Sequence, residues 1–112
     1  MPVREFYSAV VERNADWSGK VETEPYEAGW ASEAIALVRV LGVGGMPGTL
    51  SLRAQVSPDG IQWCDEGTES RASTGPGLSF IRLCHLGNWL RLAGETTEGA
   101  TFRIIAYWAL KQ

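Results

Sequence analysis

The sequence predicts an all-β protein, a single antiparallel β-sandwich of jelly-roll or discoidin-like type with about seven or eight short strands. Three observations favour this fold class. Apolar and polar residues alternate with period two in several segments, Gly- and Pro-rich turns separate those segments, and no segment has a convincing helical pattern. A chain of 112 residues can bury a core of its own, so we expect one domain spanning residues 1–112.

The first half of the chain predicts three strands and a loop. β-Branched and aromatic residues favour a strand from Phe6 to about residues 14–16. Residues 20–24 are an edge strand or an ordered loop, whose acidic residues would discourage further pairing. Residues 30–42 are apolar on both alternating faces, which predicts a central strand buried on both sides, although residues 31–37 also suit a helix. The glycine-rich segment 42–48 is expected to be a loop.

The clearest hairpin is predicted at residues 49–63. Its first strand alternates polar residues with four apolar ones, namely Leu50, Leu52, Ala54 and Val56. The next four residues, Ser57-Pro58-Asp59-Gly60, have the composition of a tight turn. Ile61 and Trp63 then resume the alternation, and we expect Trp63 to lie in the core with Trp108. This composition predicts an architectural role for the hairpin.

The second half predicts a long loop followed by three strands. Residues 64–77 are polar and rich in Gly, Ser and Thr, which favours a surface loop. Residues 78–84 form a strand that we expect to pair with residues 88–93 through a turn at residues 87–88. After a turn at residues 95–99, the last strand places one apolar set on a single face and ties the C-terminus into a sheet. That set is Phe102, Ile104, Ala106, Trp108 and Leu110.

Charge and composition exclude several classes of partner. The formal net charge is −3, which does not attract a polyanion, so we expect no nucleic-acid binding. No apolar run approaches the roughly 18 residues of a membrane helix, so we expect no membrane insertion. The first residues lead into no apolar signal segment, which predicts synthesis in the cytoplasm without a signal peptide.

The chain has no convincing catalytic or metal-binding constellation. His85 is the single histidine, and its neighbour Cys84 would point to the opposite face of a strand. A catalytic dyad of His85 with Cys64 is a weaker hypothesis than the alternative, a structural disulfide between Cys64 and Cys84. The acids that could hold calcium match no spaced loop and are interpreted as turn residues. These are Asp59, Asp65, Glu66 and Glu69. We therefore expect no enzyme activity, cofactor or metal.

Aromatic residues are the remaining candidates for binding. An aromatic side chain at the surface stacks on a sugar ring or anchors a protein interface, because it buries a large area at low entropic cost. For the tryptophans beside turns, capping the ends of the core is the alternative. The interface or ligand candidates are Trp17, Trp30, Trp89, Tyr26, Phe6 and Tyr7.

Two motifs carry a resemblance to known sandwiches. The run from Ser57 to Trp63 resembles the Ser-x-Asp-Gly-x-x-Trp hairpin of discoidin-like domains and of small β-sandwich proteins from tailed phages. Residues 88–92 are similar to the later aromatic-x-Arg strand of those domains, so the resemblance covers roughly residues 35–110. Both cysteines are internal, unlike the terminal pair that often closes discoidin-like lectins.

The sequence therefore predicts a non-catalytic structural protein that forms a homo-oligomer or docks on a larger protein assembly. The resemblance makes this concrete as an accessory or decoration protein of a phage-like virion, hence a virion-associated location. The alternative is a carbohydrate-binding module, with one of the turn tryptophans stacking on a glycan.

Overall fold

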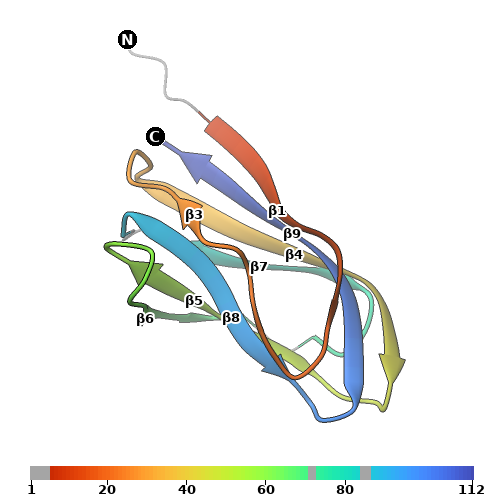
Figure 1. Cartoon of the computed structure of the whole chain (residues 1–112). Helices are drawn as coiled ribbons and strands as arrows, with labels where there is room; N and C mark the ends of the chain where they lie inside the picture. The colour runs from red at the N-terminus through yellow and green to blue at the C-terminus, as the bar shows by residue number, and fades with distance from the viewer. Residues whose placement is uncertain (1–5, 71–72, 84–86) are drawn as a thin grey trace.

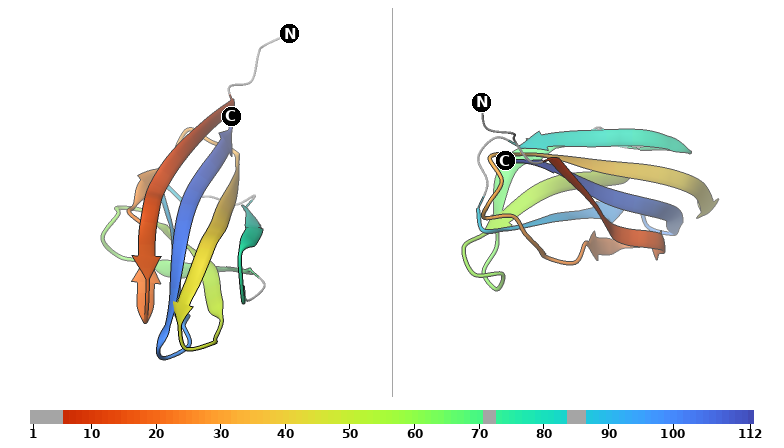
Figure 2. Two further views of the ribbon diagram at one scale, coloured as in Figure 1. Left: turned by 90° about the vertical axis from the view of Figure 1, so that its right-hand side faces the viewer. Right: turned by 90° about the horizontal axis from the view of Figure 1, so that it is seen from above.

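The polypeptide forms two antiparallel sheets packed face to face (Figure 1; Figure 2). The computed structural model describes residues 6–70, 73–83 and 87–112, with the backbone alone for residues 6 and 7. The strands in these ranges are β1 (Phe6–Trp17), β2 (Lys20–Glu22), β3 (Tyr26–Glu27), β4 (Glu33–Gly45), β5 (Leu50–Ser57), β6 (Cys64–Glu69), β7 (Gly77–Leu83), β8 (Trp89–Thr96) and β9 (Ala100–Lys111). The predicted all-β sandwich is confirmed.

The order of strands in the two sheets is that of a jelly roll. One sheet has the order β1-β9-β4-β7, and the other has the order β2-β8-β5-β6 with β3 also paired to β8. When β2 and β3 are taken as one interrupted strand, each sheet has four positions, and successive strands alternate between the sheets except at the β5–β6 hairpin. We call the first layer the β9 sheet and the second the β8 sheet. The view from above in Figure 2 shows the two layers separately.

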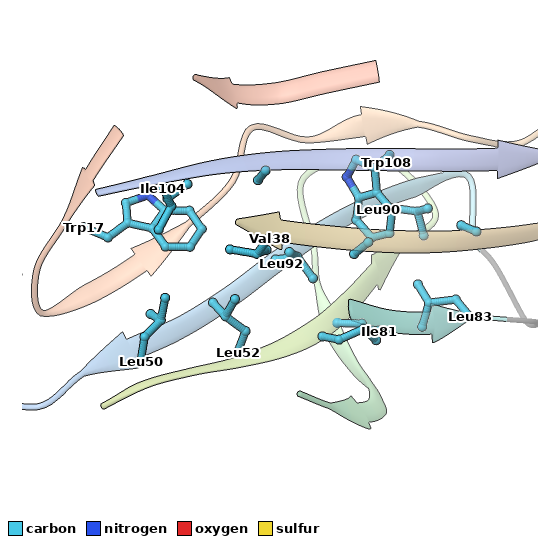
Figure 3. Packing of buried hydrophobic residues seen from close by; sticks show 14 of the residues in the cluster. Trp17, Val38, Leu50, Leu52, Ile81, Leu83, Leu90, Leu92, Ile104 and Trp108 are labelled. Atoms are coloured by element: carbon cyan, nitrogen blue, oxygen red, sulfur yellow. The ribbon is translucent and has the colours of Figure 1, made fainter. Parts of the chain in front are cut away.

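The core lies between the inner faces of the two sheets (Figure 3). β9 supplies all five of its predicted inward residues, and each of them is buried. Trp108 is fully buried, and its indole Nε1 has no hydrogen-bond partner among the described residues. An unpaired buried donor costs about 1–3 kcal/mol, so the large apolar area of the ring must offset that cost.

Most strands lie where the sequence pattern placed them. The segment with an alternative helical interpretation is β4, a strand between β9 and β7, as its valines favoured. The first strand and the turn of the predicted hairpin are confirmed, but its second strand is β6, which begins at Cys64 and not at Ile61. β9 ties the C-terminus between β1 and β4, as predicted. β2 lies at the edge of its sheet, as expected for residues 20–24.

Three predicted elements were wrong. Residues 64–69 form strand β6 within the expected loop. Pairing with β5 satisfies the backbone hydrogen bonds of this polar edge strand, which has no apolar alternation that could reveal it in the sequence. β7 and β8 belong to different sheets, so they are not hairpin partners; alternation identifies a strand without identifying its neighbour. β4 continues to Gly45, because the backbone of residues 42–45 pairs with β9 whether or not side chains are present.

Two burial predictions were also wrong. Trp63 is only half-buried, and its ring lies under the guanidinium group of Arg91 with 4.4 Å between Cζ and the ring centroid. β4 is buried on its inner face alone, because the described residues provide no third layer to cover the outer face of the β9 sheet. Apolar composition on both faces therefore overstated the burial of β4 in a single copy.

Gly94→Ala is expected to lower the free energy of unfolding by about 1–3 kcal/mol. Gly94 lies in β8 between β2 and β5, and a Cβ atom there would come within 2.0 Å of the Ser51 carbonyl oxygen. The clash is with the backbone of β5, so no side chain can move aside and the strands must separate. Urea unfolding measures the change. Gly44→Ala is the control because its Cβ would meet nothing within 4 Å; equal losses in both variants would contradict this explanation.

Candidate functional site

The outer face of the β9 sheet carries a continuous apolar surface. Residues directly paired across antiparallel strands point to the same face, so the strand register identifies its members. The central row crosses all four strands, since Val10 pairs with Tyr107, Tyr107 with Leu37, and Leu37 with Phe80. We call these four residues the apolar row. Figure 2 shows β1, β9 and β4 side by side in this layer, with β7 beyond them.

Further apolar residues extend this surface on both sides of the row. Ile35 pairs with Ala109 on one side, and Ile105 and Leu78 pair with Arg39 on the other. The exposed fractions of Leu78, Phe80 and Val10 are 65%, 54% and 43%. We call the outer face the set Val10, Ile35, Leu37, Leu78, Phe80, Ile105, Tyr107 and Ala109. A contiguous apolar surface of this kind marks an interaction site more often than a scattered exposed residue does.

Three arginines, Arg39, Arg82 and Arg103, lie next to the apolar residues of the outer face. Arg82 pairs with Ile35 across the strands, and its Cζ lies 5.2 Å from the centroid of the Phe80 ring. Neither Arg39 nor Arg82 has a carboxylate partner within the described ranges. Asp16 and Arg103 pair with each other at 3.1 Å at one end of the sheet. That hydrogen bond and charge attraction lower the pKa of Asp16 and raise the pKa of Arg103.

The outer face of the β8 sheet is polar and internally paired. Arg91 Nε donates to Gln55 Oε1 at 2.7 Å, and Arg91 Nη1 lies 3.2 Å from Glu22 Oε2. Gln55 Nε2 donates to Asp65 Oδ1 at 2.9 Å, and Arg53 Nε lies 3.3 Å from that same oxygen. These groups satisfy one another and face water. The two faces of the sandwich therefore differ, and the β9 sheet presents the apolar one.

The Ser57–Trp63 hairpin has an architectural role, as the sequence predicted. Buried Ser57 accepts hydrogen bonds at Oγ from the backbone N–H groups of Asp59 and Gly60 at 3.2 and 2.8 Å. Asp59 Oδ1 accepts from the N–H groups of Ile61 and Gln62, both at 2.9 Å. Gly60 adopts φ 79°, which is strained for other residues. These bonds close the turn.

The aromatic candidates are dispersed. Trp17 is 6% exposed and belongs to the core, which agrees with the capping alternative. Trp89 and Tyr26 are half-buried; the Trp89 ring lies against Gly60, and Tyr26 packs on the core. Trp30 is 42% exposed on the turn before β4. The backbones of residues 6 and 7 pair with Lys111 and Leu110, whereas the side chains of these two candidates, Phe6 and Tyr7, lie outside the described residues.

None of the binding candidates predicted from the sequence belongs to the outer face. Leu37, Phe80 and Leu78 lie in segments that the pattern predicts only as strands. The signal that could have revealed the face was the double-sided apolarity of residues 35–41, which was interpreted as burial within one copy. A strand that is apolar on both sides requires a cover on both sides, and that cover can be another molecule.

The described residues offer little for catalysis or metal binding. No group of three or more His, Cys, Asp or Glu side chains within them could hold a metal ion. Cys64 is exposed and free, and its Sγ lies 3.7 Å from the Val56 carbonyl oxygen. Cys84 and His85 lie outside the described residues, so the predicted alternatives of a dyad and a disulfide both involve undescribed partners. No helix in the described part of the chain is long and apolar enough to cross a membrane.

Comparison with known proteins identifies a similar fold. No family model matches the chain, and no curated protein matches its sequence. The crystal structure of the SPBc2 prophage-derived protein YomS is similar, with a TM-score of 0.63 over 100% of this chain and 97% of that chain. At 7% identity, this likeness concerns the fold alone. It confirms a similarity to an all-β protein of prophage origin, but it does not confirm the predicted discoidin-like motif.

Asp59→Ala is expected to lower stability at neutral pH and to weaken its dependence on acid pH. The backbone N–H groups of Gln62 and Ile61, with the Ser57 hydroxyl, hold the pKa of Asp59 below its ordinary value of 3.8. Because the folded pKa is the lower one, the stabilisation is complete above 3.8 and is lost as the pH falls through the folded value. Urea midpoints measured between neutral pH and about pH 2.5 test this. Parallel curves for the variant and the wild type would show that Asp59 contributes nothing.

Proposed function

We propose that this protein is a non-catalytic structural protein that self-associates within a phage-like particle, as an accessory or decoration subunit. The observation that carries this proposal is the outer face, an apolar surface four strands wide. On a single copy this surface meets water. A partner that covers it would recover the free energy of burying those side chains, about 25 cal/mol for each Å² of apolar area.

The outer face is large enough to form the centre of a protein interface. Four strands about 4.8 Å apart, and three rows of side chains about 7 Å apart, give a patch of roughly 300–400 Å² that includes Arg39 and Arg82. This is about half of the roughly 800 Å² that each partner buries in a standard interface, so contacts around the patch must supply the rest. An aromatic and aliphatic centre with arginines at the rim is the composition that interfaces favour.

The fold and the similar structure of prophage origin both support a role in a phage-like particle, although neither decides it. Jelly rolls occur in viral capsid proteins and in lectins, so the architecture alone does not choose between our two candidate functions. The similar structure of prophage origin favours the first. Virion association remains part of the proposal, and co-sedimentation of the protein with particles from the source strain would test it directly.

Replacing Leu37 and Phe80 with serine together is expected to convert the oligomer to a monomer without unfolding the chain. These neighbours lie in the apolar row, outside the core, so the change removes adhesive area while leaving the inner packing intact. Light scattering coupled to size exclusion measures the mass, and circular dichroism checks the fold. Ile61→Ser is the control because Ile61 is 80% exposed on the distant hairpin turn. A wild-type protein that is monomeric at its highest soluble concentration would refute the proposal.

The carbohydrate-binding alternative depends on Trp30, the most exposed tryptophan in the described part of the chain. If this protein binds glycans, titration with a soluble glycan will change tryptophan fluorescence, and Trp30→Ala will abolish the response. Trp63→Ala is the matched control, since the Trp63 ring is already covered by Arg91. The structural proposal expects no saturable change in the wild-type protein, and the absence of a response across a glycan panel would remove the alternative.

A further inference from the structure

We propose that the free edge of β7 pairs with β7 of a second copy, antiparallel across a two-fold axis, so that two β9 sheets become one continuous sheet. This inference rests on the self-association proposed above and adds a second contact, at the edge of the sheet beside the outer face, which edge pairing does not cover. An edge strand presents unpaired backbone N–H and C=O groups, which are a template for another strand. The sandwich has four sheet edges, which differ in length, charge and regularity.

The β1 edge of the β9 sheet is irregular over part of its length. Its register with β9 is regular from Phe6 to Val10, then shifts between Val10 and Glu12 and again between Glu12 and Ala15. Asn14 between these points adopts φ 51°, and the adjacent Arg13 is exposed. Bulges and charges of this kind twist an edge away from further pairing. β1 therefore offers a shorter regular edge than β7 does.

Both edges of the β8 sheet are also poor templates. β2 has three residues and β3 has two, so this side offers only interrupted backbone. β6 has six residues, of which Asp65, Glu66 and Glu69 are acidic. Its register with β5 shifts between Arg53 and Gln55. Short length, like charges and a register shift are the means by which sandwiches discourage edge pairing.

β7 has none of these features. Its seven residues pair one to one with Ala34–Val40 of β4 without a register shift. Arg82 is its single charge, and the exposed side chains of Leu78 and Phe80 lie beside it on the outer face. No strand in the described ranges pairs with the other edge of β7. A regular, apolar edge of this type is a site of strand addition.

The sequence of β7 is compatible with pairing to itself. A two-fold axis perpendicular to the sheet makes the paired strands antiparallel and keeps outward side chains outward. With the axis at Phe80, the two Phe80 rings are neighbours and Arg82 lies opposite the partner's Leu78. The two Arg82 residues are then four positions apart along the strand, about 13 Å, which exceeds the screening length of about 8 Å at physiological salt. The pairing also joins the apolar rows of both copies into one.

Phe80→Lys is expected to weaken self-association by up to about fivefold, because it replaces the single Phe80–Phe80 pair on the axis with two like charges directly opposite each other. Val10→Lys is the matched control. Val10 lies in the same apolar row with a similar exposure, but on the β1 edge of the sheet. Sedimentation equilibrium gives the dissociation constants. Equal weakening by both variants would overturn the β7 assignment while leaving association through the outer face intact.

Hydrogen exchange locates the contact without any substitution. The amides of residues 77–83 should exchange more slowly as wild-type concentration rises through the association range, while those of residues 8–14 should not change. Protection of β7 that grows with the oligomer fraction supports the pairing. An oligomer that leaves β7 exchange unchanged overturns the pairing but preserves the proposed function. A strict monomer at every concentration overturns both.

Discussion

Strand β9 determines the core and the outer face of its sheet together. It lies between β1 and β4, and its register with β4 has no shift from Lys111 to Ile104. Trp108 and its inward neighbours fill the space between the sheets, while Ile105, Tyr107 and Ala109 form the middle of the outer face. Because the side-chain period is two, a slip of one residue would exchange these sets and expose the core. The same alternation therefore specifies both the fold and the apolar outer face.

The two outer faces of the sandwich differ in polarity. On the β8 sheet, Arg91, Gln55 and their acidic partners satisfy one another and present a hydrated surface. On the β9 sheet the outer face is apolar, and Arg39 and Arg82 lack acidic partners among the described residues. This asymmetry suits the proposed subunit of an assembly, because one face would contact its neighbours while the other remains hydrated.

Local pattern was enough to predict the fold class and most strands. Alternation in residues 101–110 and the turn chemistry of Ser57 to Gly60 both depend on neighbouring residues, and both are confirmed. Partner choice is non-local, which is why β7 was paired with β8 and why polar β6 was taken for a loop. The candidate site depends on a property that no single-chain pattern contains, namely whether an apolar face is covered by the same chain. The burial predicted for residues 35–41 is correct on the inner face of β4, whereas their other face belongs to the outer face of the sheet.

The most direct test of this account is oxidative footprinting of aromatic side chains across a concentration series. Phe80 and Tyr107 belong to the apolar row, while Trp30 lies on a turn away from it and serves as the internal reference. Oxidation of Phe80 and Tyr107 should fall as the protein associates, with Trp30 unchanged. Constant oxidation of all three residues, in a protein that light scattering shows to be assembled, would contradict the claim that the outer face of the β9 sheet is the contact surface.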